Sequence, residues 1–126
     1  MKIALTSIPV NDPVEAFAFY TGVLGFTERL FMPEANLAIV ASPEDAEGVG
    51  LLLEPNDHPQ YRALQEALYN EGIPSLILGT DDIHAEYERL SAQGVTFRQP
   101  PEASEAGILA IFDDTCGNLI QIYQAP

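Results

Sequence analysis

The chain has 126 residues, 47% of them hydrophobic, which suits one globular domain or two small modules that share a core. Nineteen acidic residues outnumber five basic ones, giving a formal net charge of −14. This charge disfavours nucleic acid and anionic membranes as partners, because phosphate contacts need lysine and arginine, and it favours cationic small molecules.

The first predicted elements are a strand over residues 2–10 and a helix over residues 12–24. Asp12 is a good N-cap, Pro13 suits the first helical turn, and Gly25 can take the left-handed conformation that ends a helix. The spacing of the apolar residues predicts a buried stripe made of Val14, Phe17, Thr21 and Leu24.

Three strands and a connecting helix follow. The strands are predicted over residues 26–32, 37–42 and 49–54. The third is apolar until its final carboxylate, Glu54, which indicates a strand buried on both faces. An ordered linker helix is predicted within residues 57–72, capped by Asp57 or His58. Its apolar stripe is Tyr61, Leu64 and Leu68.

The second half of the chain repeats the first. Asp81 and Gly94 follow Asp12 and Gly25 at the same offset of 69 residues. A helix with the stripe Ile83, Tyr87 and Leu90 lies between them. Strands are predicted over residues 75–80, 95–99, 108–112 and 118–123, with a loop over 100–107. The repeat predicts an α+β fold of two βαβββ modules within one domain, residues 1–56 and 73–126, joined by the linker helix.

Three short segments carry a resemblance to a known family. They run from Asp12 through Phe19-Tyr20 to Leu24-Gly25-Phe26, from Asp81-Asp82-Ile83 to Gln93-Gly94-Val95, and from Asp113 to Asn118. In this order the chain resembles the vicinal oxygen chelate superfamily, which includes glyoxalase I, extradiol dioxygenases and bleomycin resistance proteins. The resemblance implies curled sheets around a ligand cup and, in many members, a homodimer.

The family's metal enzymes carry one ligand on the first and last strand of each module. Carried over to this sequence, those positions are Leu5, Glu54, Ser75 and Gln121. Only Glu54 is a strong metal ligand, and a stable divalent site usually needs at least three. We therefore expect no metal cofactor. His84 is expected to be a solvated helix residue and His58 a loop or capping residue.

Strand parity then predicts which residues line the cup: Leu5, Ser7, Leu52, Glu54, Ser75, Ile77, Leu119, Gln121 and Tyr123. If Glu54 faces the cup beside Leu5, burial would favour its protonated form, and it could act as a general acid or base. The alternative is a solvated carboxylate at the end of a strand. The repeat also predicts that Glu54 and Gln121 occupy equivalent positions, at an offset of 67 residues.

Two arginines and one cysteine complete the candidates. Arg29 and Arg98 are related by the repeat and could clamp a carboxylate, although surface ion pairs are the simpler interpretation. Cys116 is expected to be unreactive, because its neighbours Asp113 and Asp114 disfavour the thiolate. As the only cysteine, it cannot form an internal disulfide.

Three functions are compatible with the sequence. The favoured one is a metal-independent binder of a small molecule, with a cationic ligand as one version of it. The alternatives are an enzyme of the same superfamily (a lyase, isomerase or dioxygenase) with an unconventional metal site, and a dimeric accessory protein without a ligand. The N-terminus lacks the features of a signal peptide, so a cytoplasmic protein is expected, and symmetric homodimers are the commonest oligomers.

Overall fold

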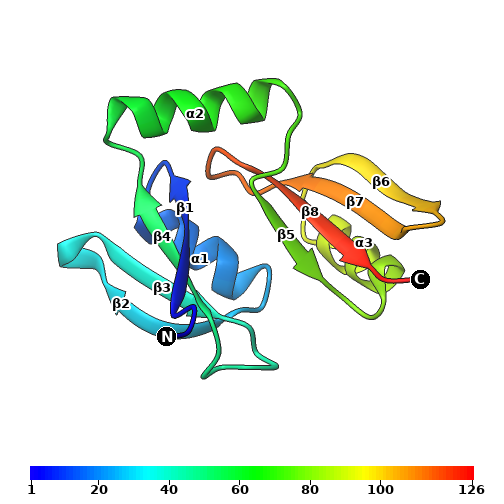
Figure 1. Cartoon of the computed structure of the whole chain (residues 1–126), viewed down its shortest axis with the longest axis horizontal. Coiled ribbons are helices and arrows are strands. Elements are labelled where there is room, and N and C mark those ends of the chain that lie inside the picture. Colours follow the sequence, from blue (N-terminus) through cyan, green and yellow to red (C-terminus); the bar gives the residue numbers. More distant parts are fainter. The chain divides into compact units, whose positions relative to one another are not determined.

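The computed structural model describes all 126 residues and confirms the repeat of two βαβββ modules. The first eight elements of secondary structure include the linker helix. In chain order they are β1 (Leu5–Val10), α1 (Pro13–Gly22), β2 (Thr27–Met32), the short 3-10 helix η1 (Pro33–Ala35), β3 (Leu37–Ala41), β4 (Gly50–Pro55), α2 (Pro59–Asn70) and β5 (Leu76–Gly79). The remaining elements are α3 (Ile83–Ala92), β6 (Phe97–Ser104), β7 (Gly107–Asp113) and β8 (Leu119–Gln124) (Figure 1).

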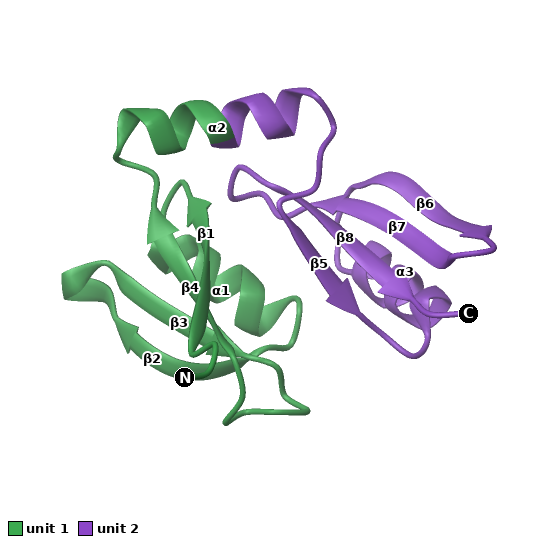
Figure 2. Ribbon diagram, viewed as in Figure 1, with its two compact units in different colours: residues 1–64 green, residues 65–126 purple.

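The chain divides into two compact units, residues 1–64 and 65–126, with the boundary inside α2 (Figure 2). Each unit holds one four-stranded sheet, in the order β1-β4-β3-β2 or β5-β8-β7-β6. In both sheets the first and last strands of the module pair in parallel, and the other pairs are antiparallel. No helix is long and apolar enough to cross a membrane.

The core of each unit lies between its sheet and one helix, α1 or α3 (Figure 1). In the first unit, the alternate residues Ile8 and Val10 of β1 and Leu51 and Leu53 of β4 are buried. The faces of β4 therefore differ, and the prediction that it is buried on both is wrong, because Glu54 and Leu52 are only half-buried. Period-two alternation decides which strand residues reach the core.

The predicted buried stripe of α1 is wrong. Ala16 and Tyr20 are fully buried, whereas Val14 is exposed. Phe17, from the predicted stripe, instead stacks on Phe31 of β2 with ring centroids 4.0 Å apart. Since α1 carries apolar residues around most of its surface, spacing alone did not determine which side faces the sheet.

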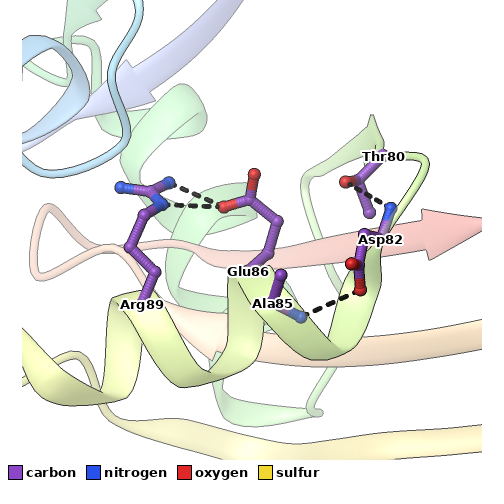
Figure 3. A network of polar contacts seen from close by, with 5 residues as sticks. All are labelled: Thr80, Asp82, Ala85, Glu86 and Arg89. Carbon is purple, nitrogen blue, oxygen red and sulfur yellow. Dashed lines mark hydrogen bonds and ion pairs between the residues drawn. The ribbon is translucent and has the colours of Figure 1, made fainter.

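Both module helices begin at an aspartate. The Asp12 carboxylate accepts a hydrogen bond from the Val14 N–H at 2.9 Å. In α3 the cap is Asp82, one residue beyond the predicted start, and it accepts from the Ala85 N–H at 3.0 Å (Figure 3). The predicted stripe of α3 is confirmed at Ile83 and Leu90, which are both buried. Gly25 and Gly94 have φ near +88° and +87°, as predicted for residues that end helices.

Strand β6 extends to Ser104 and includes most of the segment predicted as a loop. Its two prolines, Pro100 and Pro101, lie between residues where the pairing with β7 shifts register. Because β6 is an edge strand, prolines at an irregularity remove few ladder hydrogen bonds. Prolines therefore mark a bulge here and not the end of the strand.

The linker helix α2 forms as predicted, and His58 caps it by accepting from the Gln60 N–H at 3.2 Å. Its predicted apolar stripe is wrong at Leu64, which is exposed, while Gln65 is buried. The Gln65 amide lies 3.4 Å from the Cys116 carbonyl oxygen and 3.5 Å from the Asn118 side-chain oxygen. Polar contacts with a distant turn thus set the buried side of this helix.

Candidate functional site

The first sheet has one face covered by α1 and a second face that no helix of its unit covers (Figure 1). Residues paired across strands lie on the same face, so the register divides this open face into rows. The middle row runs across the four strands as Ser7, Leu52, Ile39 and Leu30. Toward one end of the strands, Leu5 pairs with Gly50, and toward the other, Pro9 pairs with Glu54.

This open face is largely apolar. Leu5, Leu30 and Met32 are 44%, 38% and 39% exposed, and Leu52 and Ile39 are half-buried. Exposed apolar residues scattered singly are normal on a protein surface, but here they share one sheet face in register. The arrangement offers an apolar surface on which a ligand or another protein surface could pack.

A polar group closes one end of this face. Glu54 comes from the end of β4, Ser7 from β1 and Tyr61 from the first turn of α2. The pKa of the Tyr61 phenol is raised, mainly by burial. The neighbouring Ser7 hydroxyl lowers it, while the nearby Glu54 carboxylate, through its negative charge and its acceptor oxygens, raises it. Tyr61 therefore lies near both Ser7 and Glu54, so that this part of the face presents a carboxylate, a phenol and a hydroxyl.

Tyr61 was missed as a site residue because the sequence predicted it only as part of the stripe of the linker helix. No local pattern reports that the start of α2 meets β1 and β4. The start of α2 is held near β1 through Asn56. The Asn56 N–H donates to the Val10 carbonyl at 3.2 Å, and the Arg62 guanidinium donates to the Asn56 backbone carbonyl and side-chain oxygen, both at 3.2 Å.

Arg29 occupies the opposite end of the same face. It lies where the pairing of β2 with β3 shifts register, between Glu28 and Leu30. A Cβ atom added to Gly50 would lie 2.7 Å from the Arg29 Nη1 atom and 2.8 Å from Cδ2 of Leu5. The guanidinium thus rests over a glycine that leaves room for it. Its Nη2 atom donates to the Ala46 carbonyl at 2.6 Å.

The expected proximity of Leu5 and Glu54 is wrong. Leu5 pairs with Gly50, whereas Glu54 pairs with Pro9, four residues further along the strand. Four residues of a strand span about 13 Å, so Leu5 and Glu54 lie at opposite ends of the open face. The polar side chain that lies near Glu54 is Tyr61.

In the second unit, the predicted residues also belong to the face away from the module helix. Ile77 pairs with Gln121 and is 62% exposed, and the Ser75 N–H donates to the Leu119 carbonyl at 2.8 Å. Leu119 itself is only 1% exposed, so its side chain is buried and offers little surface to a ligand. Tyr123 donates its hydroxyl proton to the Ala106 carbonyl at 2.8 Å.

The structure corrects the register of the repeat. Ser7 lies five residues before the helix cap Asp12, and Ile77 lies five residues before the cap Asp82, so these two residues are equivalent. Ser7 pairs with Leu52, and Ile77 pairs with Gln121. Gln121 is therefore the counterpart of Leu52 and not of Glu54. The predicted equivalence of Glu54 and Gln121 is wrong by two residues.

The two repeat-related arginines have different surroundings. Both lie at register shifts of edge strands, which confirms that the repeat relates the two positions. Arg98 lies 4.9 Å from the centre of the Tyr69 ring, whose hydroxyl donates to the Asp113 carboxylate. Neither arginine forms an ion pair within the protein. An ion pair links Arg89 to Glu86 on α3, with an N–O distance of 2.7 Å (Figure 3).

The donor set does not suit a divalent metal. No three His, Cys, Asp or Glu side chains are grouped to hold an ion. At the positions where the family's metal enzymes carry ligands, Leu5 cannot bind a metal and Ser75 would do so poorly at neutral pH. His58 and His84 are both exposed, His58 as the cap of α2. Cys116 is buried in the turn before β8, where a reactive thiol would not be expected.

The sequence matches the family model described as the Glyoxalase/Bleomycin resistance protein/Dioxygenase superfamily over residues 2–122. The chain belongs to this superfamily. Among curated proteins, it is 45% identical over 126 residues to the uncharacterized protein YurT of Bacillus subtilis, covering 98% of this chain and 99% of that protein. It is also 33% identical over 128 residues to an uncharacterized protein of Shewanella frigidimarina, covering 98% of this chain and 93% of that protein.

Solved structures of the superfamily have the same fold. The crystal structure of UcmS2 matches with a TM-score of 0.80 and 30% identity, covering 98% of this chain and 97% of that one. TnmS3, described as an antibiotic binding protein from Streptomyces sp. CB03234, matches with a TM-score of 0.78 and 27% identity, covering 100% and 97% of the two chains. The fold is therefore shared with a protein that is described as antibiotic binding.

Proposed function

We propose that this protein binds a small amphipathic molecule, a cationic one in particular, without a bound metal ion. The observation that carries the proposal is the open face of the first sheet, where an apolar row ends beside the Glu54 carboxylate and the Tyr61 phenol. An apolar surface with a few convergent polar groups is typical of small-molecule sites. The net charge of −14 adds a long-range attraction for cations.

The similarity to TnmS3 supports the same ligand class. That protein is described as antibiotic binding, and its chain and this one cover almost all of each other. A shared fold alone does not determine function, so the residues of the open face are the main support for the proposed ligand class. An enzyme of the superfamily remains the alternative. It would need either a metal held by an unconventional donor set or catalysis by Glu54 without one.

A ligand screen by thermal shift tests the proposal. The screen is run on metal-stripped protein with a chelator, and again with added nickel, zinc, manganese or iron. We expect cationic amphipathic compounds to raise the melting temperature equally in both series, because a ligand that binds only the folded state stabilises it. Stabilisation that requires a metal would contradict metal independence.

Glu54→Gln then tests the site on any compound that binds. We expect this change to weaken a cationic ligand by about tenfold or more, since a charge-assisted contact becomes a neutral one. Unchanged affinity would show that the ligand binds elsewhere. If the protein is an enzyme, the same change should abolish turnover and leave the fold intact.

We also propose that the protein is a homodimer in the cytoplasm. Symmetric dimers are the commonest state of soluble oligomers, and the exposed apolar residues of the first sheet could be shared between a ligand and a second copy. Light scattering at micromolar concentration measures the state directly. A mass close to the 13.7 kDa of one chain would contradict the dimer.

A further inference from the structure

The two ends of the open face carry opposite charges. Glu54 lies at one end, near Tyr61, and the Arg29 guanidinium lies over Gly50 at the other. Gly50 and Glu54 are four residues apart on β4, so about 13 Å separates the two ends. The row between them contains Leu52 and Ile39, which pair directly across β4 and β3.

Both charged groups can still bind a ligand. A guanidinium has five N–H donors, and Arg29 uses one of them to donate to the Ala46 carbonyl. Neither Arg29 nor Glu54 takes part in an ion pair within the protein. Each end therefore has a charge that a ligand of the opposite charge could neutralise.

We propose that the open face of the first sheet selects an elongated zwitterion, with its protonated amine at Glu54, an apolar body over Leu52 and Ile39, and its carboxylate at Arg29. This inference rests on the proposed function and adds the length and polarity of the ligand. The amine has acceptors in the Glu54 carboxylate and the neighbouring hydroxyl oxygens, and the guanidinium suits bidentate binding of a carboxylate.

Four simple probes separate the contributions of the two ends: ω-aminododecanoate, ω-aminohexanoate, dodecylamine and dodecanoate. Calorimetry on metal-stripped protein below the micelle concentration measures each affinity. We expect ω-aminododecanoate to bind most tightly, because it is long enough to reach both charges. The shorter ω-aminohexanoate cannot reach both and should bind at least about tenfold more weakly, the loss of one charge-assisted contact.

Variants assign each probe end to its residue. Glu54→Gln should weaken the two long amines about tenfold and leave dodecanoate no weaker, whereas Arg29→Gln should weaken the two long carboxylates and spare dodecylamine. Tyr61→Phe is a second variant for the amine end, and it should weaken only the amines. Arg89→Gln is the matched control: it also changes the net charge by one unit but lies on the exposed face of α3.

The outcomes separate the two proposals. Tight binding of the long probes that neither Glu54→Gln nor Arg29→Gln changes selectively would overturn the zwitterion inference and leave the proposed function standing. Equal weakening of every probe by both variants would overturn it as well. Absence of binding by all probes to the unmodified protein would overturn both.

Discussion

Gly50→Ala should disturb the Arg29 end of the site while leaving the fold intact. The added methyl group would lie 2.7 Å from Nη1 of Arg29, 2.8 Å from Cδ2 of Leu5 and 3.0 Å from Cγ2 of Ile39. Carbon atoms in contact prefer about 3.5–4.0 Å, so all three neighbours must retreat. The Arg29 and Leu5 atoms are ends of side chains that can move, whereas Cγ2 of the β-branched Ile39 moves less freely. The guanidinium should therefore leave its position over the strand.

The expected magnitude follows from two opposing terms. Overpacking costs about 1–3 kcal/mol, and replacing glycine by alanine inside a strand regains about 0.5–1 kcal/mol. We therefore expect a net loss near 1 kcal/mol in the free energy of unfolding, measured by urea denaturation. Gly79→Ala is the matched control, because no atom lies within 4 Å of its added Cβ, and it should not destabilise the protein.

A measurement of probe binding completes the test of Gly50→Ala. With the guanidinium displaced, Gly50→Ala should weaken dodecanoate as Arg29→Gln does, and it should spare dodecylamine. If Gly50→Ala is as stable as Gly79→Ala and keeps its full affinity for the carboxylate probe, the position assigned to Arg29 is wrong.

Three further predictions test other parts of the account. Metal analysis of the purified protein should find no stoichiometric divalent ion, and a tightly bound one would contradict the proposal. Tyr69→Phe should cost about 1–3 kcal/mol in unfolding free energy, because it leaves the Asp113 carboxylate without its phenol donor. Tyr87→Phe is the control and should cost less, because the hydroxyl of this half-buried ring forms no hydrogen bond within the protein. The raised pKa of Tyr61 means that folding favours its neutral phenol, so its contribution to stability is complete below pH 10.0 and is lost as the pH rises through the raised value. Glu54→Gln should lower that pKa, and an ultraviolet titration of the phenolate compared with Tyr61→Phe would show whether it does.

The sequence predicted most of the fold because its signals were local. Asp12 caps α1 as expected, and Gly25 and Gly94 adopt the left-handed conformation at the ends of their helices. These residues act through their own backbone neighbourhood, which a sequence displays directly. The order of helices and strands followed from such punctuation and from the repeat.

Helix faces were harder to predict. In α1, apolar residues surround most of the helix, and the choice of Ala16 and Tyr20 as the buried side depends on packing against the sheet. In α2, Gln65 is buried because acceptors at residues 116 and 118 lie beside it. Both outcomes depend on parts of the chain that are distant in sequence.

The candidate site was predicted in part. Parity correctly placed Ser7, Leu52 and Glu54 on one face. The strand register, however, separates Leu5 from Glu54 and makes Leu52 the counterpart of Gln121. A shift of two residues keeps every side chain on its face, so the alternation of the sequence cannot detect the error. Tyr61 joined the site through the long-range placement of α2.

Metal-independent ligand binding on the open face is tested most directly by a crystal structure. The structure would be that of metal-stripped protein bound to the tightest compound from the thermal-shift screen. We expect ligand density on the open face of the first sheet, with a cationic nitrogen within hydrogen-bond distance of the Glu54 carboxylate and no metal ion beside it. A ligand bound away from that face, or one coordinated to a metal ion, would contradict the account.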